Sequence, residues 1–120
     1  MAIHLVSYAL GGSDNKAMQN RLHDLVEGVD CHRKYDKLFL IESGYIDRHT
    51  DLFEDGKLEG YLSWQPYIIL NAMDGAADGD LFIYCDIEYA LDAQAINFIK
   101  THVSNGFFFV RGNLLSIYHT

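Results

Sequence analysis

The sequence predicts a three-layer α/β domain in which a mainly parallel sheet carries helices on both faces. Short, unbroken apolar runs, which are typical of strands buried on both faces, alternate along the chain with stretches of helical periodicity. The resulting order is strand, helix, strand, long loop, helix, strand, helix, strand. Such alternation favours a parallel sheet of Rossmann-like type, and ligands bind such sheets outside the carboxyl ends of the strands.

Four apolar runs predict the strands, and a fifth segment is a further candidate. The runs are residues 3–8, 37–42, 81–85 and 107–110, and the further candidate is residues 114–118. The run at 81–85 is expected at the centre of the sheet, and Ile83 lies in its middle. We therefore expect the side chain of Ile83 to be buried.

Three segments have the features of helices. From about residue 14 to residue 27 the apolar spacing is helical, and Ser13 or Asp14 can cap the start. Residues 66–73 begin with proline, which suits a first helical turn, and are mostly apolar on every side, so we expect heavy burial. Asp92 can cap a last helix.

The segment between the second strand and the second helix, residues 43–63, shows no periodicity and is rich in glycine and charge. Connections of this length in compact domains are often functional. We expect residues 43–60 to be the least ordered part of the chain in the absence of ligand.

The composition fits one globular domain that spans residues 1–120. Hydrophobic residues make up 49% of the chain and charged residues 22%, which argues against disorder. The 9 basic and 17 acidic residues give a formal net charge of −8. Because phosphate backbones bind basic surfaces, this balance argues against a nucleic acid partner.

The sequence predicts a cytoplasmic protein. No apolar stretch is long enough to span a bilayer, and the first residues lack the pattern of a signal peptide. The two cysteines, Cys31 and Cys85, lie in different sequence contexts, which favours two buried thiols over a disulfide.

The sharpest local feature is the pair of carboxylates in Asp86-Ile87-Glu88, directly after the predicted central strand. Two such groups at i and i+2 can turn toward one point at the sheet edge, and hard oxygen ligands suit Mg²⁺ or Mn²⁺. On spacing alone, a helix cap or a solvated turn is favoured over a metal site.

Two other features give weaker indications. The turn Gly11-Gly12-Ser13 before a helix has backbone amides that can hold a phosphate, but it lacks the spacing of known phosphate loops, so a plain strand-to-helix turn is favoured. The six histidines are scattered, and none forms an i, i+4 pair on a predicted helix face, which argues against zinc.

Two longer blocks carry a family resemblance. Residues 60–70 read GYLSWQPYIIL, and residues 78–86 read DGDLFIYCD. In this order they resemble a family of small glycosyltransferases, in which G-Y-W-x-W-K-P-Y-I-I-L leads into G-D-(apolar)-Y-x-D-A-G. The resemblance covers roughly residues 3–110. It implies a GT-A fold whose nucleotide-sugar-binding half ends in a DxD-like motif that holds Mn²⁺ or Mg²⁺.

The resemblance also implies a set of site residues. For the nucleotide-sugar these are Tyr8, Ala9, Trp64, Gln65 and Asp86, and for the metal they are Asp86 and Glu88. Gln65 stands where the family has lysine, so a phosphate contact made by that cation is lost. Glu88 replaces the usual residue at the third motif position.

The function that the resemblance predicts is a glycosyltransferase-like protein that binds a nucleotide-sugar donor with a divalent cation. Members of the family have a second half that shapes the acceptor site, and no block of this chain matches it, so we expect a truncated or minimal form. One alternative is a non-catalytic nucleotide- or metabolite-binding module. The other is an oligomeric interaction protein, and the 16 aromatic residues favour a homodimer.

Overall fold

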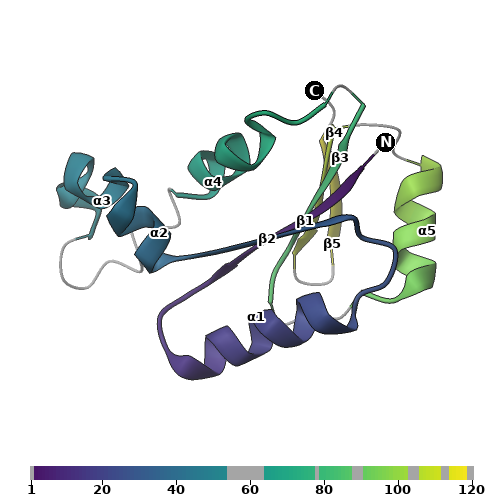
Figure 1. Ribbon diagram of the computed structural model, residues 1–120, viewed down its shortest axis with the longest axis horizontal. Coiled ribbons are helices and arrows are strands. Elements are labelled where there is room, and N and C mark those ends of the chain that lie inside the picture. Colours follow the sequence, from purple (N-terminus) through teal and green to yellow (C-terminus); the bar gives the residue numbers. More distant parts are fainter. Residues whose placement is uncertain are drawn as a thin grey trace.

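The strands form a five-stranded sheet in the order β2-β1-β3-β4-β5 (Figure 1). The computed structural model describes residues 2–53, 64–77, 79–87 and 91–102, with the backbone alone at 52–53, 106–111 and 114–118. The elements are β1 (Ile3–Ala9), α1 (Ser13–Leu25), β2 (Cys31–Asp36), α2 (Lys37–Glu42), α3 (Tyr45–Arg48), the 3₁₀ helix η1 (Thr50–Phe53), α4 (Trp64–Met73), β3 (Leu81–Cys85), α5 (Ala93–His102), β4 (Gly106–Arg111) and β5 (Leu114–Tyr118). Strands β2, β1, β3 and β4 are parallel, and β5 runs antiparallel to β4, so the prediction of a mainly parallel sheet is confirmed.

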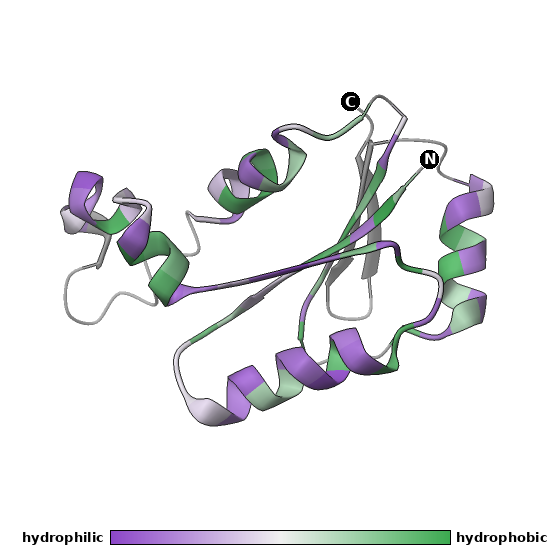
Figure 2. Ribbon diagram, in the orientation of Figure 1, coloured by the Kyte–Doolittle hydropathy of each residue, from purple (hydrophilic) through white to green (hydrophobic). Residues whose placement is uncertain are grey.

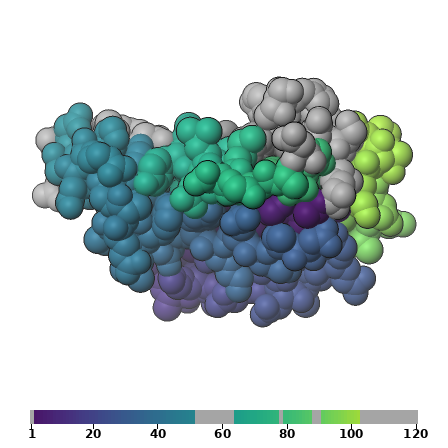
Figure 3. Space-filling view, turned by 45° about the horizontal axis from the view of Figure 1, so that its top comes forward, coloured from purple at the N-terminus to yellow at the C-terminus, as the bar shows by residue number. Residues whose placement is uncertain are grey.

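Helices cover both faces of the sheet, as the sequence predicts. Side chains alternate between the faces of a strand, so Leu5 and Ile83 pack under α1 and α5, while Val6 and Tyr84 pack under α2, α3 and α4. Figure 1 shows these helices on opposite sides of the strands, and Figure 3 shows α4 across the middle of one face with α2 and α3 beside it. The domain therefore has three layers.

The centre of the sheet is formed by strands without exposed residues. Every residue of β1 and of β3 is buried, and Ile83 has no exposed surface, which confirms its expected burial. Figure 2 shows the contrast between these apolar strands and β2, whose ribbon is mostly hydrophilic. β2 is the edge strand on its side of the sheet.

The prediction of a strand at residues 37–42 is wrong, because this segment is α2 and the strand is Cys31–Asp36 directly before it. The boundary is set by Asp36, whose carboxylate accepts a hydrogen bond from the backbone amide of Phe39 at 3.2 Å. This bond caps α2, and a capped start favours the helix over a continued strand.

The misassignment has a physical cause in the burial of the two elements. In α2, Leu40 is fully buried while Leu38 and Ile41 are exposed, so the continuous apolar run is not the mark of a buried strand. In β2, half-buried and exposed positions alternate from Cys31 to Lys34 and only Tyr35 is buried, because the strand lies at an edge; its sequence CHRKYD therefore lacks the apolar run that marks a central strand.

The long connection is more regular at its start than the sequence predicts. The helices α3 and η1 occupy Tyr45–Arg48 and Thr50–Phe53, and Gly44 joins α2 to α3 with a φ of 81°, which favours glycine. Residues 54–63 lie outside the described part of the chain. The expectation of low order across residues 43–60 stays a prediction.

The other helices agree with the sequence in place but not in every detail. α1 matches the predicted segment closely, yet its cap position is Gly12, and no side chain caps it. The Asp92 carboxylate caps α5 by accepting the Ala95 amide at 2.8 Å, as expected. The expected all-round burial of α4 is wrong, because Leu70 is 67% exposed. No helix in the described ranges is long and apolar enough to cross a membrane.

The crossover connections depart from the doubly wound pattern. The chain passes from β1 through α1 to the strand on one side, and from β3 through α5 to the strand on the other side. Both helices nevertheless pack on the same face of the sheet. The two crossover connections run in opposite directions along the sheet but place their helices on the same face, so they have opposite handedness. In a doubly wound sheet, all crossover connections have the same handedness.

The burial pattern predicts the cost of truncating an isoleucine. Ile83→Ala removes a fully buried side chain between the sheet and the helices α1 and α5 and should lower the free energy of unfolding by about 3–4 kcal/mol. Ile41→Ala makes the same change where the side chain is 52% exposed, and should alter it by less than about 1 kcal/mol. Urea denaturation followed by circular dichroism measures both, and equal losses would contradict the placement of β3 at the centre.

Candidate functional site

The pairing of β1 changes toward its carboxyl end. β1 pairs with β2 as far as Ala9 and Asp36, whereas its pairing with β3 ends at Val6 and Tyr84. The chain leaves β1 toward β2 on one side and later returns to β3 on the other, so the strand order reverses here. In open parallel sheets, ligands bind at such a point, beyond the carboxyl ends of the strands.

A pocket of about 300 Å³ lies at this edge, beside the ends of β1 and β2. Its walls are the turn after β1, the first turn of α1 and the start of α2. The lining residues are Ala9, Leu10, Gly11, Gly12, Ser13, Lys16, Asp36, Lys37 and Leu38. Gly12 has a φ of 111°, a conformation that favours glycine, and so the turn can expose its backbone to the pocket.

The charged groups of the pocket come from α1 and from the junction of β2 with α2. The ammonium group of Lys16 forms an ion pair with the Asp36 carboxylate, and Lys37 follows on the same wall. Partial burial alone would raise the pKa of Asp36, but hydrogen bonds from Lys16 and from the Phe39 amide outweigh it and lower that pKa below 3.8. The pocket thus holds two cations and one ionised carboxylate.

The structure brings together three of the predicted nucleotide-sugar residues near the end of β1. The rings of Tyr8 and Trp64 stack with centroids 3.6 Å apart and planes 20° apart, and both are buried. Ala9 lies next along β1 and lines the pocket. Gln65 follows Trp64 on α4 and is half-buried. Of the predicted residues described here, Ala9 alone lines the pocket.

The predicted metal ligands are placed only in part. Asp86 directly follows β3, next to the edge where the pocket lies, and is half-buried. Glu88 lies outside the described residues. Within the described ranges, no group of three or more His, Cys, Asp or Glu side chains gathers in a way that could hold a metal ion. The pairing of Asp86 with Glu88 therefore stays a prediction.

Trp64 contributes an unsatisfied donor to this region. It is 2% exposed, and its indole nitrogen Nε1 is the buried side-chain polar atom, among the described residues, that has no hydrogen-bond partner. A buried donor without an acceptor costs about 1–3 kcal/mol. An acceptor atom supplied by a ligand would remove that cost.

Sequence reasoning missed a chain of polar side chains between β1, α1 and β2. Ser7 Oγ lies 2.7 Å from His23 Nε2, and His23 Nδ1 lies 2.9 Å from His32 Nδ1. Gln19 donates hydrogen bonds to Ser7 Oγ and to the Tyr35 carbonyl, both at 3.0 Å. No spacing signal could have found this chain, because its members come from three different elements.

The Ser7–His23–His32 chain has the connectivity of a nucleophile, a base and an orienting group. Ser7, however, has no exposed surface and lies in the middle of β1 beneath α1. A substrate cannot reach its hydroxyl in this fold. Burial, then the nearby His32 and Lys34, lower the pKa of His23 to about 4, so His23 is neutral at pH 7.

The Cys85 thiol is unsuited to nucleophilic chemistry. Both cysteines are free of disulfides, as predicted; Cys85 is buried, but Cys31 is only half-buried and lies on β2. Burial, and then the charge of Asp86, raise the pKa of Cys85 to about 12, which keeps it protonated and inert.

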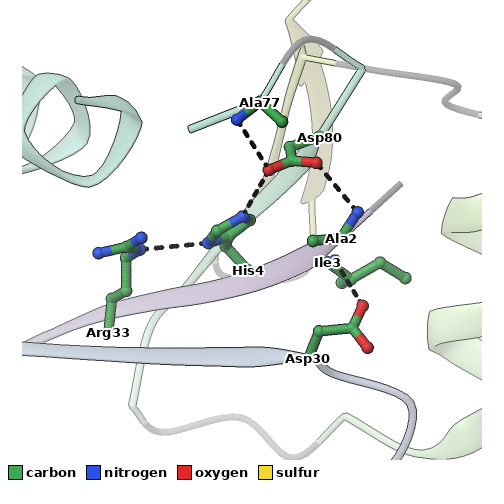
Figure 4. Close-up of polar contacts among 7 residues, drawn as sticks. All are labelled: Ala2, Ile3, His4, Asp30, Arg33, Ala77 and Asp80. Atoms are coloured by element: carbon green, nitrogen blue, oxygen red, sulfur yellow. Dashed lines mark hydrogen bonds and ion pairs between the residues drawn. The ribbon is translucent and has the colours of Figure 1, made fainter. Parts of the chain in front are cut away.

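A second polar cluster lies at the opposite, amino-terminal edge of the sheet (Figure 4). Asp80 accepts hydrogen bonds from the amides of Ala2 and Ala77 and lies 3.0 Å from His4 Nε2. Arg33 Nε donates to His4 Nδ1 at 3.2 Å, so His4 Nε2 carries the proton and donates to Asp80. This cluster ties β1, β2 and the segment before β3 together, and its role is structural.

Comparisons with protein-family models, curated proteins and solved structures found no match to this chain. The class of the protein therefore follows from its own geometry. It is an α/β domain with a mainly parallel sheet and a pocket at the carboxyl edge of that sheet.

The Asp80 cluster predicts an acid-sensitive contribution to stability. The Ala2 amide and the His4 side chain hold the pKa of Asp80 below its ordinary 3.8. Because the folded pKa is lowered, the contribution is present above pH 3.8 and is lost as the pH falls through the folded pKa. Asp80→Asn should lower the melting temperature by several degrees at neutral pH, and the gap should close in acid.

Asp74→Asn is the matched control, since Asp74 is exposed after α4 and its side chain can be neutralised without loss of this cluster. Melting curves by circular dichroism across the acid range make the comparison. Equal melting temperatures for the two variants at neutral pH would show that the cluster does not hold the amino edge.

Proposed function

We propose that this chain is a glycosyltransferase-like protein of GT-A type that binds a nucleotide-sugar donor at the carboxyl edge of its sheet. The observation that carries the proposal is the pocket beside the ends of β1 and β2, lined by Lys16, Lys37 and the backbone of residues 9–13. Its place in the fold is the place where α/β domains bind nucleotides. The resemblance of residues 60–86 to small glycosyltransferases supports the sugar part of the donor.

The pocket has the chemistry of a diphosphate site. A chain with a net charge of −8 repels phosphate over most of its surface, so the two lysines that line this pocket are a local exception. The first backbone amides of α1 have no side-chain cap. They lie at the amino-terminal end of the helix, where anions are stabilised. The volume of about 300 Å³ is at the lower end for small-molecule sites, which suits part of a nucleoside diphosphate.

The stacked pair Tyr8 and Trp64 supports a place for the rest of the donor. Trp64 is one of the residues that match the family pattern, and its indole N–H has no acceptor among the described residues. A hydroxyl or carbonyl oxygen of the nucleoside or sugar supplies such an acceptor. Stacking on Tyr8 fixes the orientation of the Trp64 ring, so less side-chain entropy is lost when the donor binds.

A divalent cation completes the proposed site. Asp86 and Glu88 would supply hard oxygen ligands of the kind that hold Mn²⁺ or Mg²⁺. In a transfer reaction, such a cation stabilises the charge that develops on the departing nucleoside diphosphate. The chain's own part is to position the diphosphate through Lys16 and Lys37.

A second candidate function is a nucleotide- or metabolite-binding module without turnover. Gln65, a neutral residue where the family has lysine, favours it, because the site then lacks one cation for the leaving group. Hydrolysis of a nucleotide-sugar separates the two candidates, since a binding module binds the donor without consuming it.

The third candidate, an oligomeric interaction protein, rests on exposed apolar side chains. Leu38 and Ile41 on α2 and Leu70 on α4 are each more than half exposed. Such groups often mark contacts between copies of a chain. Analytical ultracentrifugation tests the proposed homodimer directly.

The metal site predicts a cation-dependent affinity. Mn²⁺ should raise the affinity for nucleoside diphosphates, because a cation held by Asp86 and Glu88 would offset the repulsion between these carboxylates and the phosphate groups. Asp86→Asn keeps the shape but removes one anionic ligand, so it should abolish that gain, which we expect to be at least about tenfold. Glu88→Gln should have a smaller effect, and calorimetry with Mn²⁺ or with chelator measures all three.

Two controls separate the parts of the site. Asp74 lies at the other edge of the sheet, so Asp74→Asn should leave the Mn²⁺-dependent gain in affinity unchanged. Lys37→Met should weaken binding with and without Mn²⁺, because it removes a pocket cation. If wild type and Asp86→Asn bind equally under all conditions, Asp86 is a turn residue and the metal proposal is wrong.

A further inference from the structure

A row of polar contacts joins α1 to the edge strand β2. From the first turn of α1 to its last, the pairs are Lys16 with Asp36, Asn20 with Lys34 and His23 with His32. Successive pairs are separated by four and then three residues along α1, a rise of about 6 and 4.5 Å, and by two residues along β2, a rise of about 6.6 Å. The spacing of the contacts on the helix therefore nearly matches their spacing on the strand. We call these three pairs the α1–β2 seam.

The last pair of the seam depends on protonation in a way that the others do not. His23 Nδ1 and His32 Nδ1 face each other at 2.9 Å, so one nitrogen donates and the other must accept. When both rings carry two protons, neither Nδ1 can accept and two positive charges meet. His23 is buried at this point, whereas His32 is exposed on β2.

We propose that the His23–His32 contact is a proton-operated latch, which holds the second half of α1 against β2 at neutral pH and opens in acid. The inference does not depend on the proposed function, because His23 and His32 lie outside the pocket lining. Opening exposes His23 to water, where its ring takes up a proton that the closed position excludes. Acid therefore favours the open form of the helix.

The groups around His23 support the direction of the switch. From β2, His32 and Lys34 face it and disfavour a positive charge; from β1, the neutral hydroxyl of Ser7 faces it. Asp24, on its own helix, favours the charge but is the weakest influence. Burial comes first, and together these groups lower the pKa of His23 from 6.5 to about 4, so the switch operates between these values.

The first half of α1 stays in place over the same range. The ion pair of Lys16 with Asp36 persists, because the pKa of Asp36 lies below its ordinary 3.8. Opening is thus confined to the part of the helix after Gln19. A local opening of this kind differs from unfolding of the whole domain.

Native-state hydrogen exchange at about pH 7 and about pH 4.5, with increasing urea, tests the latch. A shift of the pKa from 6.5 to about 4 predicts that the opening equilibrium for amides 20–25 rises roughly 50-fold between these conditions. Exchange there should depend only weakly on urea in acid, while β3 should exchange through global unfolding with a steep dependence. If α1 exchanges as steeply with urea as β3 at both pH values, no separate latch exists.

Three variants identify the group responsible. His23→Gln keeps a partner for Ser7 but cannot titrate, so the rise should fall below about threefold. His32→Asn offers a carbonyl oxygen at any pH and should reduce the rise without abolishing it, because the burial of His23 remains. His102→Asn is the matched control; its ring contacts the Phe98 carbonyl on α5, and it should behave as wild type.

Each variant result decides the proposal. A wild-type rise in His23→Gln would overturn the latch, because another group must then sense the acid. If His23→Gln does not fold, His32→Asn decides alone, and an unreduced rise there would show that the histidine contact plays no part.

Discussion

β1 is buried along its whole length and on both of its faces, yet it carries two polar side chains, His4 and Ser7. A buried polar group without a partner costs about 1–3 kcal/mol, so each of these residues requires partners that other elements must deliver. On one face, His4 bonds to Arg33 and Asp80. On the other face, Ser7 bonds to His23 and Gln19. The need to satisfy these two side chains places the surrounding elements on β1.

β2 shows how much depends on those bonds. As an edge strand with the sequence CHRKYD, it buries little apolar surface, and Tyr35 is its one buried residue. Its position is fixed instead by polar contacts, from Arg33 to His4 of β1 on one face and from His32 to His23 of α1 on the other. Asp30, just before β2, adds a bond from the Ile3 amide at 2.8 Å. The carboxyl end of β2 is thereby held where Asp36 can form a wall of the pocket.

The parts of the fold that the sequence predicted are those stabilised by apolar burial. β1 and β3 were predicted because unbroken apolar runs are typical of central strands, and α1 because its apolar spacing is helical. β2 was missed because an edge strand does not need apolar residues, and the apolar run of α2 was misread because one of its leucines, Leu40, meets the core while Leu38 is exposed. The Ser7–His23–His32 chain could not be predicted at all, since it exists only once α1 lies across β1 and β2.

The pocket and the α1–β2 seam share the helix α1, so the two features are physically linked. α1 begins at Gly12 and Ser13 in the pocket wall, passes Lys16 at the pocket's ion pair, and reaches His23 in its last turns. Lys16 and His23 are seven residues apart, which is two helical turns, so they project from the same side of the helix toward β2. A rigid helix held at both points keeps its first amides in a fixed position relative to β1. When the second point is released, the first half of α1 remains held by the Lys16–Asp36 ion pair and by the two buried hydrogen bonds that Gln19 donates to Ser7 and to the Tyr35 carbonyl, so the pocket wall keeps its place while the end of the helix opens.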